Sequence, residues 1–284
     1  MKKEAILTKT AVIVIADMHI NSAVGLCPPI INLDDGGTYH ASRTQRWLYS
    51  CYTDFWARVS REATGYRKIL ILDGDLGELD TKRRSVQLIT ANKSTILSTV
   101  RNVLEVASWD ALYVVRGTPA HVGKSAWLEE EIGKDYDATQ SQKNVYSFYQ
   151  VRRTVNGKHL DIAHHAGMSG LGWGRSNSAN KLISKALWDY KVDRSQPPPD
   201  IIDRAHNHIY VPAIGRDNAL RCTIEAHFLP CWCGMTEYSY RAGYENVLPT
   251  IGGIVHYIEE DGGFVTKLYD YPLEKGKRLW ATAL

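Results

Sequence analysis

The sequence has 284 residues, enough for one large α/β domain or two smaller ones. Its 44% hydrophobic and 23% charged residues are ordinary for a globular protein, and a net charge of +3 gives no strong attraction to nucleic acid or membranes. The five cysteines show no spacing typical of a secreted disulfide framework, so we expect a reducing compartment and a cytoplasmic protein.

The first predicted element is a buried parallel strand at residues 11–16, AVIVIA, which is too short to span a membrane. Further apolar runs predict strands at 68–73, 111–116, 159–164 and 200–203. Helical patterns lie between the strands, at 41–63, at 85–108 and, with an exposed acidic face, at 124–137. This alternation predicts βαβ units and a mostly parallel sheet.

After residue 205 the helical patterns stop, and short strands with Gly and Pro punctuation follow. They are predicted at 208–214, 220–226, 250–261 and 263–271, with a hairpin signal at 259–264. The proline-rich stretch at 194–200 is a stiff connector, and polar clusters on both sides of it belong together. We therefore predict a single domain over residues 1–284.

Carboxylates or imidazoles follow each of the first five predicted strands of this core. They are Asp17 and His19, Asp75, His121, His164 and His165, and His206 and His208. Ligands of open α/β sheets bind outside the carboxyl ends of the strands, where these side chains would meet. Each element alone has an ordinary explanation, such as a surface turn or a capped loop, but their shared position favours a metal site.

Imidazole and carboxylate ligands without thiolate suit two divalent transition metal ions drawn from Mn, Fe, Zn, Co or Ni. The predicted ligands are Asp17, His19 and His208 for one ion, His164 and His206 for the other, and Asp75 as the bridge. Two ions roughly 3.5–4 Å apart can share a hydroxide and clamp the oxygens of a phosphoryl group. Cys231 and Cys233 are interpreted instead as packed, reduced thiols.

The order and spacing of these residues resemble those of the calcineurin-like metallophosphoesterases. The family pattern is D-x-H, G-D, G-N-H-[DE], H and G-H-x-H; here it reads DMH (17–19), GD (74–75), GTPAH (117–121), HH (164–165) and AHNH (205–208). The resemblance covers about residues 11–212. It implies a four-layer α/β/β/α sandwich of two mixed sheets, with a dimetal site at the strand ends. The aromatic and Gly motifs after residue 227 look similar to those of phage or prophage members.

The third motif departs from the family pattern. Thr118 stands where the family has an asparagine ligand, and Pro119 stands where it has a catalytic histidine. A hydroxyl is a poorer neutral ligand than an amide, so the second ion should bind more weakly or gain a ligand elsewhere. His121 is interpreted as a displaced general acid, the alternative being a loop histidine. Ala205 in place of a family glycine is a mild change.

Of the adjacent pair, His164 is the predicted ligand because it directly follows the strand, whereas His165 points away or reaches the substrate. The aromatic and Arg residues of 227–246 could stack a base and hold a phosphate, although sheet packing explains them at least as well. Residues 81–85, TKRRS, could steer an anion or begin a solvated helix.

Two functions follow. The first is a metal-dependent phosphoesterase that hydrolyses a phosphodiester or phosphomonoester through a metal-bound hydroxide, with a diester or nucleic-acid substrate ahead of a phosphoprotein. The expected partner is a phosphate ester such as a nucleotide or nucleic acid. The alternative is a non-catalytic or weakly active binding or assembly protein that keeps the fold. The oligomeric state is left open.

Overall fold

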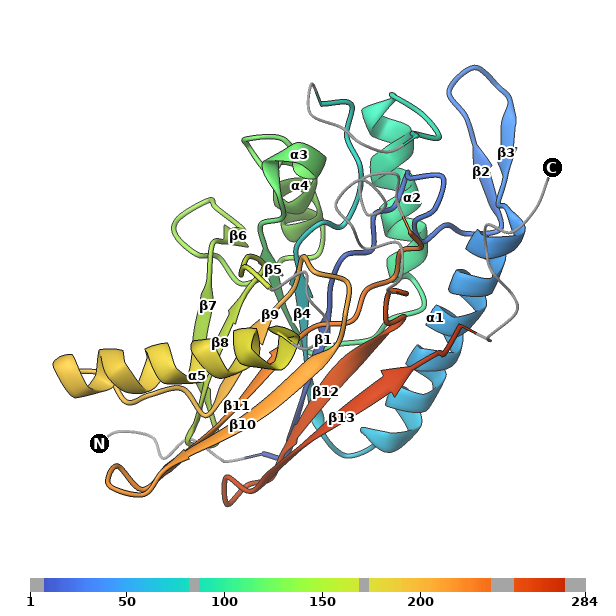
Figure 1. The fold of residues 1–284 in the computed structure, drawn as a ribbon. Coiled ribbons are helices and arrows are strands. Elements are labelled where there is room, and N and C mark those ends of the chain that lie inside the picture. Colours follow the sequence, from blue (N-terminus) through green and yellow to red (C-terminus); the bar gives the residue numbers. More distant parts are fainter. Residues whose placement is uncertain (1–7, 82–86, 169–173, 236–247, 274–284) are drawn as a thin grey trace.

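The structure is a computed structural model that describes residues 8–81, 87–168, 174–235 and 248–273 (Figure 1). Its helices are α1 (Arg43–Glu62), α2 (Lys93–Leu104), α3 (Pro119–Val122), α4 (Trp127–Asp135) and α5 (Arg175–Val192). Its strands are β1 (Thr10–Ile15), β2 (Ile30–Asn32), β3 (Thr38–His40), β4 (Arg67–Asp73), β5 (Ala111–Val115), β6 (Ser147–Phe148), β7 (Val151–Val155), β8 (Lys158–Ala163), β9 (Ile201–Arg204), β10 (Val211–Asp217), β11 (Cys222–Phe228), β12 (Gly252–Ile258) and β13 (Phe264–Asp270).

The strands form two large mixed sheets and one small hairpin. The six-stranded sheet has the order β13-β12-β1-β4-β5-β6, and the five-stranded sheet has the order β10-β11-β9-β8-β7. β1, β4 and β5 run parallel at the centre of the first sheet, with β12 antiparallel to β1. β8, β9 and β11 run parallel in the second. The parallel strands of each sheet therefore end together at one edge.

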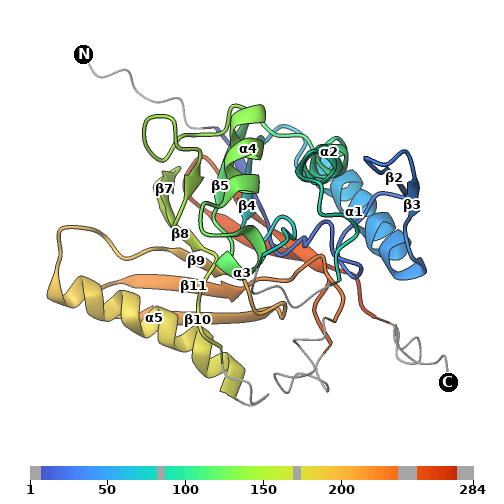
Figure 2. The same cartoon turned by 90° about the horizontal axis from the view of Figure 1, so that it is seen from above.

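The two faces of β1 show why four layers form. Ile13 and Ile15 pack in the cluster that α1, α2 and α4 cover, whereas Val12 and Val14 face the second sheet. Because successive side chains of a strand point to opposite faces, an entirely apolar strand is buried on both. On the far side, α5 covers the five-stranded sheet through Ile183 (Figure 2). The predicted sandwich of two mixed sheets is thus confirmed.

The helix predicted at 85–108 is shorter than expected. It begins at Lys93 because Asn92 caps it, with Asn92 Oδ1 accepting a hydrogen bond of 3.0 Å from Thr95 N. Ile89 precedes the helix and packs against the β2–β3 hairpin. The apolar pattern that predicted a longer helix thus included loop residues before Lys93, among them Ile89, which packs against the β2–β3 hairpin and not against the main core.

The prediction of an exposed acidic face on the helix at 124–137 is wrong. Glu129 is fully buried, and neither of its carboxylate oxygens has a hydrogen-bond partner among the described residues. Burial raises the pKa of Glu129 to about 8. Glu130 is engaged as well, since it pairs with Arg116 and accepts from Ser147 Oγ. Glu129 of α4 therefore faces inward, and Glu130 is held in contacts with neighbouring elements.

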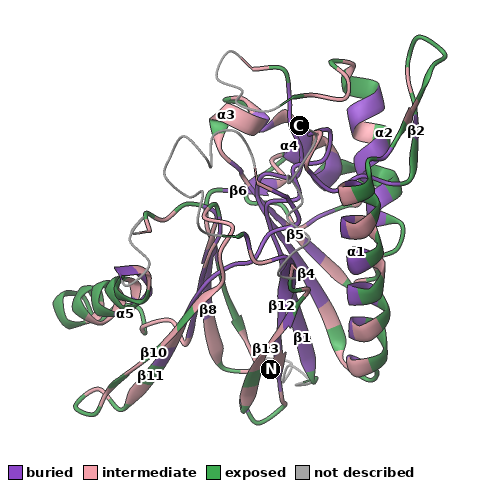
Figure 3. Ribbon diagram, turned by 45° about the vertical axis from the view of Figure 1, so that its right-hand side comes forward, coloured by how far each residue is buried: buried purple, intermediate pink, exposed green. Residues whose placement is uncertain are grey.

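The helix α5 was not predicted, because its apolar stripe is weak. Only Ser178, Ala179 and Ile183 are buried along its 18 residues, and most of its surface is exposed (Figure 3). Neither α5 nor any other helix in the described ranges combines the length and apolarity needed to cross a bilayer.

A buried polar chain connects the two sheets away from the strand ends. His256 Nε2 on β12 lies 2.9 Å from Asp203 Oδ2 on β9, and His256 Nδ1 lies 2.9 Å from Thr266 Oγ1. The Thr266 hydroxyl in turn donates to Glu225 Oε2 on β11 at 2.9 Å. His256 on β12 therefore contacts β9 directly and is connected to β11 through Thr266, which links the two sheets.

Removing one partner of this buried pair should be costly. Asp203→Ala leaves His256 Nε2 without its buried partner, and we expect the free energy of unfolding to fall by about 1–3 kcal/mol in urea denaturation. The control is Asp189→Ala, which removes an exposed i,i+4 pair with Lys185 and should cost no more than about 1 kcal/mol. Equal effects of the two substitutions would contradict a structural role for the bridge.

Candidate metal centre

The loops that follow β1, β4, β8 and β9 meet at one edge of the two sheets. Asp17 N donates to Gly74 O at 3.1 Å, which ties the first loop to the second. His206 N donates to Asp17 Oδ2 at 2.9 Å, which ties the first sheet to the second. The convergence expected from the strand-end rule is therefore built from backbone hydrogen bonds as well as from side chains.

The backbone is strained where these side chains are presented. Asp17, His19, Asp75, His206 and His208 all have positive φ, with values of 52°, 45°, 50°, 71° and 58°. Such conformations cost of order 1–3 kcal/mol for a residue with a Cβ, and they persist only where the surrounding structure enforces them. Five non-glycine residues with positive φ thus lie together at this edge, among the candidate ligands.

Two glycines leave room for side chains of the site, Gly117 for the Asp75 carboxylate and Gly74 for the His164 ring. A Cβ at Gly117 would lie 2.1 Å from Asp75 Oδ1, and a Cβ at Gly74 would lie 2.4 Å from His164 Nδ1. Gly74 also adopts a φ of +78°. A side chain at either position would displace the acidic and imidazole groups, so the glycines shape the site directly.

The first group of candidate ligands is Asp17, His19 and His208. The Nε2 atoms of His19 and His208 lie 3.1 Å apart, and His208 Nε2 lies 3.3 Å from Asp17 Oδ1. Two donors bound to one ion at about 2.1 Å lie roughly 3.0–3.4 Å apart in octahedral or tetrahedral geometry. Two of the three donor spacings therefore match those of a metal coordination shell, and the third, between His19 Nε2 and Asp17 Oδ1, is longer at 3.7 Å.

The second group is centred on His164. Its Nδ1 lies 2.6 Å from the backbone oxygen of Asp73, which leaves Nε2 free to face Asp75 Oδ2 at 2.9 Å. An outer hydrogen bond of this kind fixes the ring orientation of metal-binding histidines. The donor atoms of Asp17, Asp75 and His164 all lie within 4.8 Å of one another.

Asp17 Oδ1 is shared by both groups. It is fully buried and accepts no hydrogen bond from the described residues, yet the Nε2 atoms of His208, His19 and His164 lie 3.3, 3.7 and 3.8 Å away. A buried carboxylate oxygen without a donor is costly unless a cation neutralises it. The structure thus has a place where divalent ions fit.

The charges of the site shift the pKa values of its members. Burial alone would raise the pKa of Asp17, but His208 and His164 hold it well below its usual range. Burial alone would lower the pKa of His164, but Asp75 and Asp17 raise it to about 10. Protons on the imidazoles would thus compete with metal ions for the same nitrogens, so metal affinity should fall at low pH.

Glu78 is a site residue that the sequence reasoning missed. It is fully buried, and its Oε1 accepts a hydrogen bond of 2.7 Å from His19 Nδ1. His121 Nδ1 also lies 2.7 Å from Oε1, in an ion-pair contact whose angle departs from that of a hydrogen bond. The sequence does place the Glu78 carboxylate three residues after Asp75. No predicted strand ends at Glu78, however, so the strand-end rule did not select it.

His121 lies at the rim of the site. It belongs to the short helix α3, and its ring packs edge-on against His19 with centroids 4.7 Å apart. Its Nε2 faces Asp75 Oδ2 at 3.9 Å, and the side chain is partly exposed to solvent. This position is compatible with the general acid that we predicted.

Thr118 lies between the two sheets. Its φ and ψ of −72° and 131° are extended, as the following Pro119 predicts. Its backbone N donates to Asp75 Oδ1 at 2.5 Å, and its Oγ1 lies 3.1 Å from His206 Nδ1. All eight residues proposed as ligands or acid are therefore gathered at this edge, although their roles remain predictions.

The residues proposed for substrate binding are only partly described. Trp232 is fully buried and packs edge-on against Tyr52 and Phe55, so it is a core residue. Cys231 and Cys233 are buried free thiols, as interpreted from the sequence. Residues 236–247 and 82–86, which hold the remaining aromatic and basic side chains of those two predictions, lie outside the described residues.

Comparison with known proteins gives similarity at the level of solved structures. No family model matches the sequence, and no significant match was found among curated proteins. An archaeal phosphodiesterase aligns at 10% identity and a TM-score of 0.43, covering 91% of this chain and 99% of the other. A Mycoplasma pneumoniae phosphatase aligns at 9% identity and a TM-score of 0.42, covering 94% of this chain and 96% of the other. A Candida albicans 5'-nucleotidase aligns at 10% identity and a TM-score of 0.39, covering 94% of this chain and 52% of the other. At these values the site must be interpreted from its own residues.

The carboxylate of Glu78 should support metal binding in the first group. Glu78→Gln replaces an anionic acceptor of His19 Nδ1 by a neutral one, and we expect the affinity for Mn²⁺ to fall about 10–100-fold in calorimetric titration. Glu131→Gln, a half-buried carboxylate of α4 outside the site, is the control and should leave affinity unchanged. Wild-type affinity in Glu78→Gln would show that His19 needs no charged partner.

Proposed function

We propose that the chain is a dinuclear metal-dependent phosphoesterase. The observation that carries the proposal is the buried Asp17 Oδ1, which has three imidazole nitrogens within 4 Å and accepts no hydrogen bond from the described residues. The proposed ligands are Asp17, His19 and His208 for one ion and His164, His206 and Thr118 for the other, with Asp75 between them. Bound ions would polarise the phosphoryl oxygens and activate water for attack.

The protein's own groups position the reaction. The anionic Glu78 holds the Nδ1 side of both His19 and His121, which directs both Nε2 atoms toward the cluster. Because His121 is partly exposed while the carboxylates are buried, a substrate oxygen can approach its ring from solvent. His121 Nε2 would then give a proton to the leaving oxygen as the ester bond breaks.

The substrate class is a phosphate ester, with a phosphodiester of a nucleotide or nucleic acid preferred over a phosphoprotein. The alternative is a binding or assembly protein that keeps the fold. The feature that favours the alternative is the replacement of the family asparagine and histidine by Thr118 and Pro119. Near-complete retention of the remaining ligands favours the enzyme.

Metal analysis with a phosphoester assay tests the proposal. We expect the purified wild type to bind at least one equivalent of Mn²⁺ per chain, to lose hydrolysis of nitrophenyl monoesters or diesters on chelation, and to regain it with Mn²⁺. Asp75→Asn should keep the fold and reduce turnover at least about 100-fold, because an amide cannot neutralise the ions. The control Asp189→Asn lies on exposed α5. No metal binding, or wild-type turnover in Asp75→Asn, would refute the assignment.

The role of His121 has a kinetic signature. His121→Ala should reduce the rate about 10²–10⁴-fold on an ester with a poor leaving group, and much less on a nitrophenyl ester that leaves without a proton. Metal content should stay unchanged. The control is His40→Ala, an exposed histidine of β3. Equal losses on both substrates would indicate substrate positioning, and loss of metal would make His121 a ligand.

A further inference from the structure

Resting on the proposed function, we propose that His165 is a ligand of the second metal ion and takes the place of the missing amide ligand at Thr118. From the sequence, His165 was expected to point away or to reach the substrate, because its neighbour His164 follows the strand directly. The structure instead brings His165 together with the two histidines assigned to that ion.

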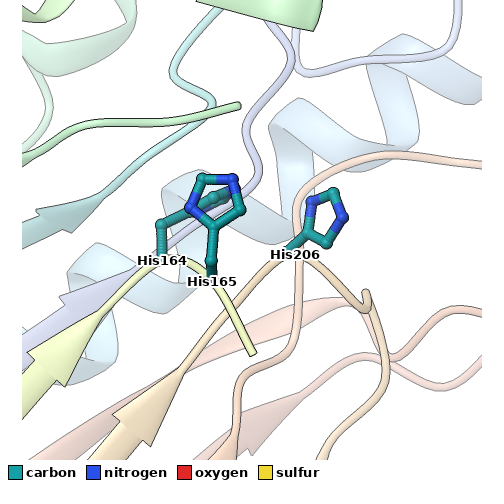
Figure 4. Close-up of side chains that lie close together, drawn as sticks. All are labelled: His164, His165 and His206. Carbon is teal, nitrogen blue, oxygen red and sulfur yellow. The ribbon is translucent and has the colours of Figure 1, made fainter. Parts of the chain in front are cut away.

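The three imidazoles form a group of their own. The donor atoms of His164, His165 and His206 lie within 4.8 Å of one another. Their ring centroids are 4.9 Å apart for His164 and His165, and 5.4 Å apart for His165 and His206. Figure 4 shows that they come from the ends of two neighbouring strands, β8 and β9. Adjacent residues of the chain therefore contribute to one cluster.

Thr118 lies between two of these rings. Its Oγ1 is 3.3 Å from His165 Nε2 and 3.1 Å from His206 Nδ1. The place of the family amide is therefore occupied by a short neutral hydroxyl with an imidazole on each side. Since nitrogen is a better ligand than a neutral hydroxyl for the later transition metals, an ion here would draw on the imidazoles first.

His165 is free to complete the coordination shell. Its side chain is exposed, and Thr118 is its sole hydrogen-bond partner among the described residues. Neighbouring donors on one ion lie roughly 3.0–3.4 Å apart for bonds of about 2.1 Å, so donor atoms that start within 4.8 Å of one another need to close by no more than about 2 Å. Rotation of an exposed imidazole supplies that movement.

The donor set implies a preference between metals. Three imidazoles with Asp75 make a nitrogen-rich site, which suits Zn²⁺, Co²⁺ or Ni²⁺ better than Mg²⁺ or Mn²⁺. The first group has two imidazoles and Asp17, with Glu78 behind it. The second ion should therefore discriminate more strongly against Mn²⁺ than the first.

Calorimetric titration with Co²⁺ tests the proposal independently of turnover. The wild type should bind two equivalents. His165→Ala should keep one and lose at least about 10-fold in affinity for the other. Thr118→Asn in the His165→Ala background should restore the second equivalent, and should add much less to the wild type. His40→Ala is the matched control, and thermal unfolding checks that each variant is folded.

The outcomes separate this proposal from the broader one. His165 would not be a ligand of the second ion if His165→Ala bound two equivalents with unchanged affinity. The same conclusion would follow if the affinities for both ions fell equally. Loss without rescue by Thr118→Asn would overturn its replacement of the amide. A wild type that binds only one equivalent would refute the second site alone, whereas a wild type that binds none would refute the proposed function as well.

Discussion

The carboxylate of Asp17 is the group on which the site depends. Its backbone N bonds to Gly74 O, its backbone O accepts from Trp232 N at 3.1 Å, and its Oδ2 accepts from His206 N. One residue therefore fixes the β4 loop, the core segment around Trp232 and the end of β9. Its remaining oxygen, Oδ1, faces the imidazoles of both candidate metal groups, so the sheets and the site are held together at the same point.

Two free-energy costs oppose this arrangement, namely backbone strain and the burial of charged side chains. Five of the proposed ligands have positive φ, and Asp17, Asp75 and Glu78 are fully buried. The apolar packing beneath the site offsets these costs: Trp232, Tyr52 and Phe55 form a network of edge-on aromatic contacts behind the β1 loop. Each such large side chain contributes about 1.5–3 kcal/mol through burial, which lets the strand ends stay in conformations they would not adopt alone.

The part of the fold that could be predicted is the part with a strong periodic signal. β1, β4, β5, β8 and β9 contain short apolar runs, and the rule for open sheets then places Asp17, Asp75 and His164 at one edge. Other features carry no such signal. Three features depend on how separate loops pack: the burial of Glu129, the contact of Glu78 with two imidazoles and the contact of His165 with Thr118. The helix α5 buries too few apolar residues to be recognised from the sequence.

The two candidate metal groups differ in what stands behind their histidines. His19 is backed by the carboxylate of Glu78, whereas His164 is backed by the neutral backbone oxygen of Asp73. An anionic partner makes an imidazole a stronger ligand than a neutral one does, so the first group should hold its ion more tightly. The same Glu78 oxygen also contacts His121. The group that binds more firmly is thus the one connected to the proposed acid, and the group with the altered third motif is the one left to recruit a further imidazole.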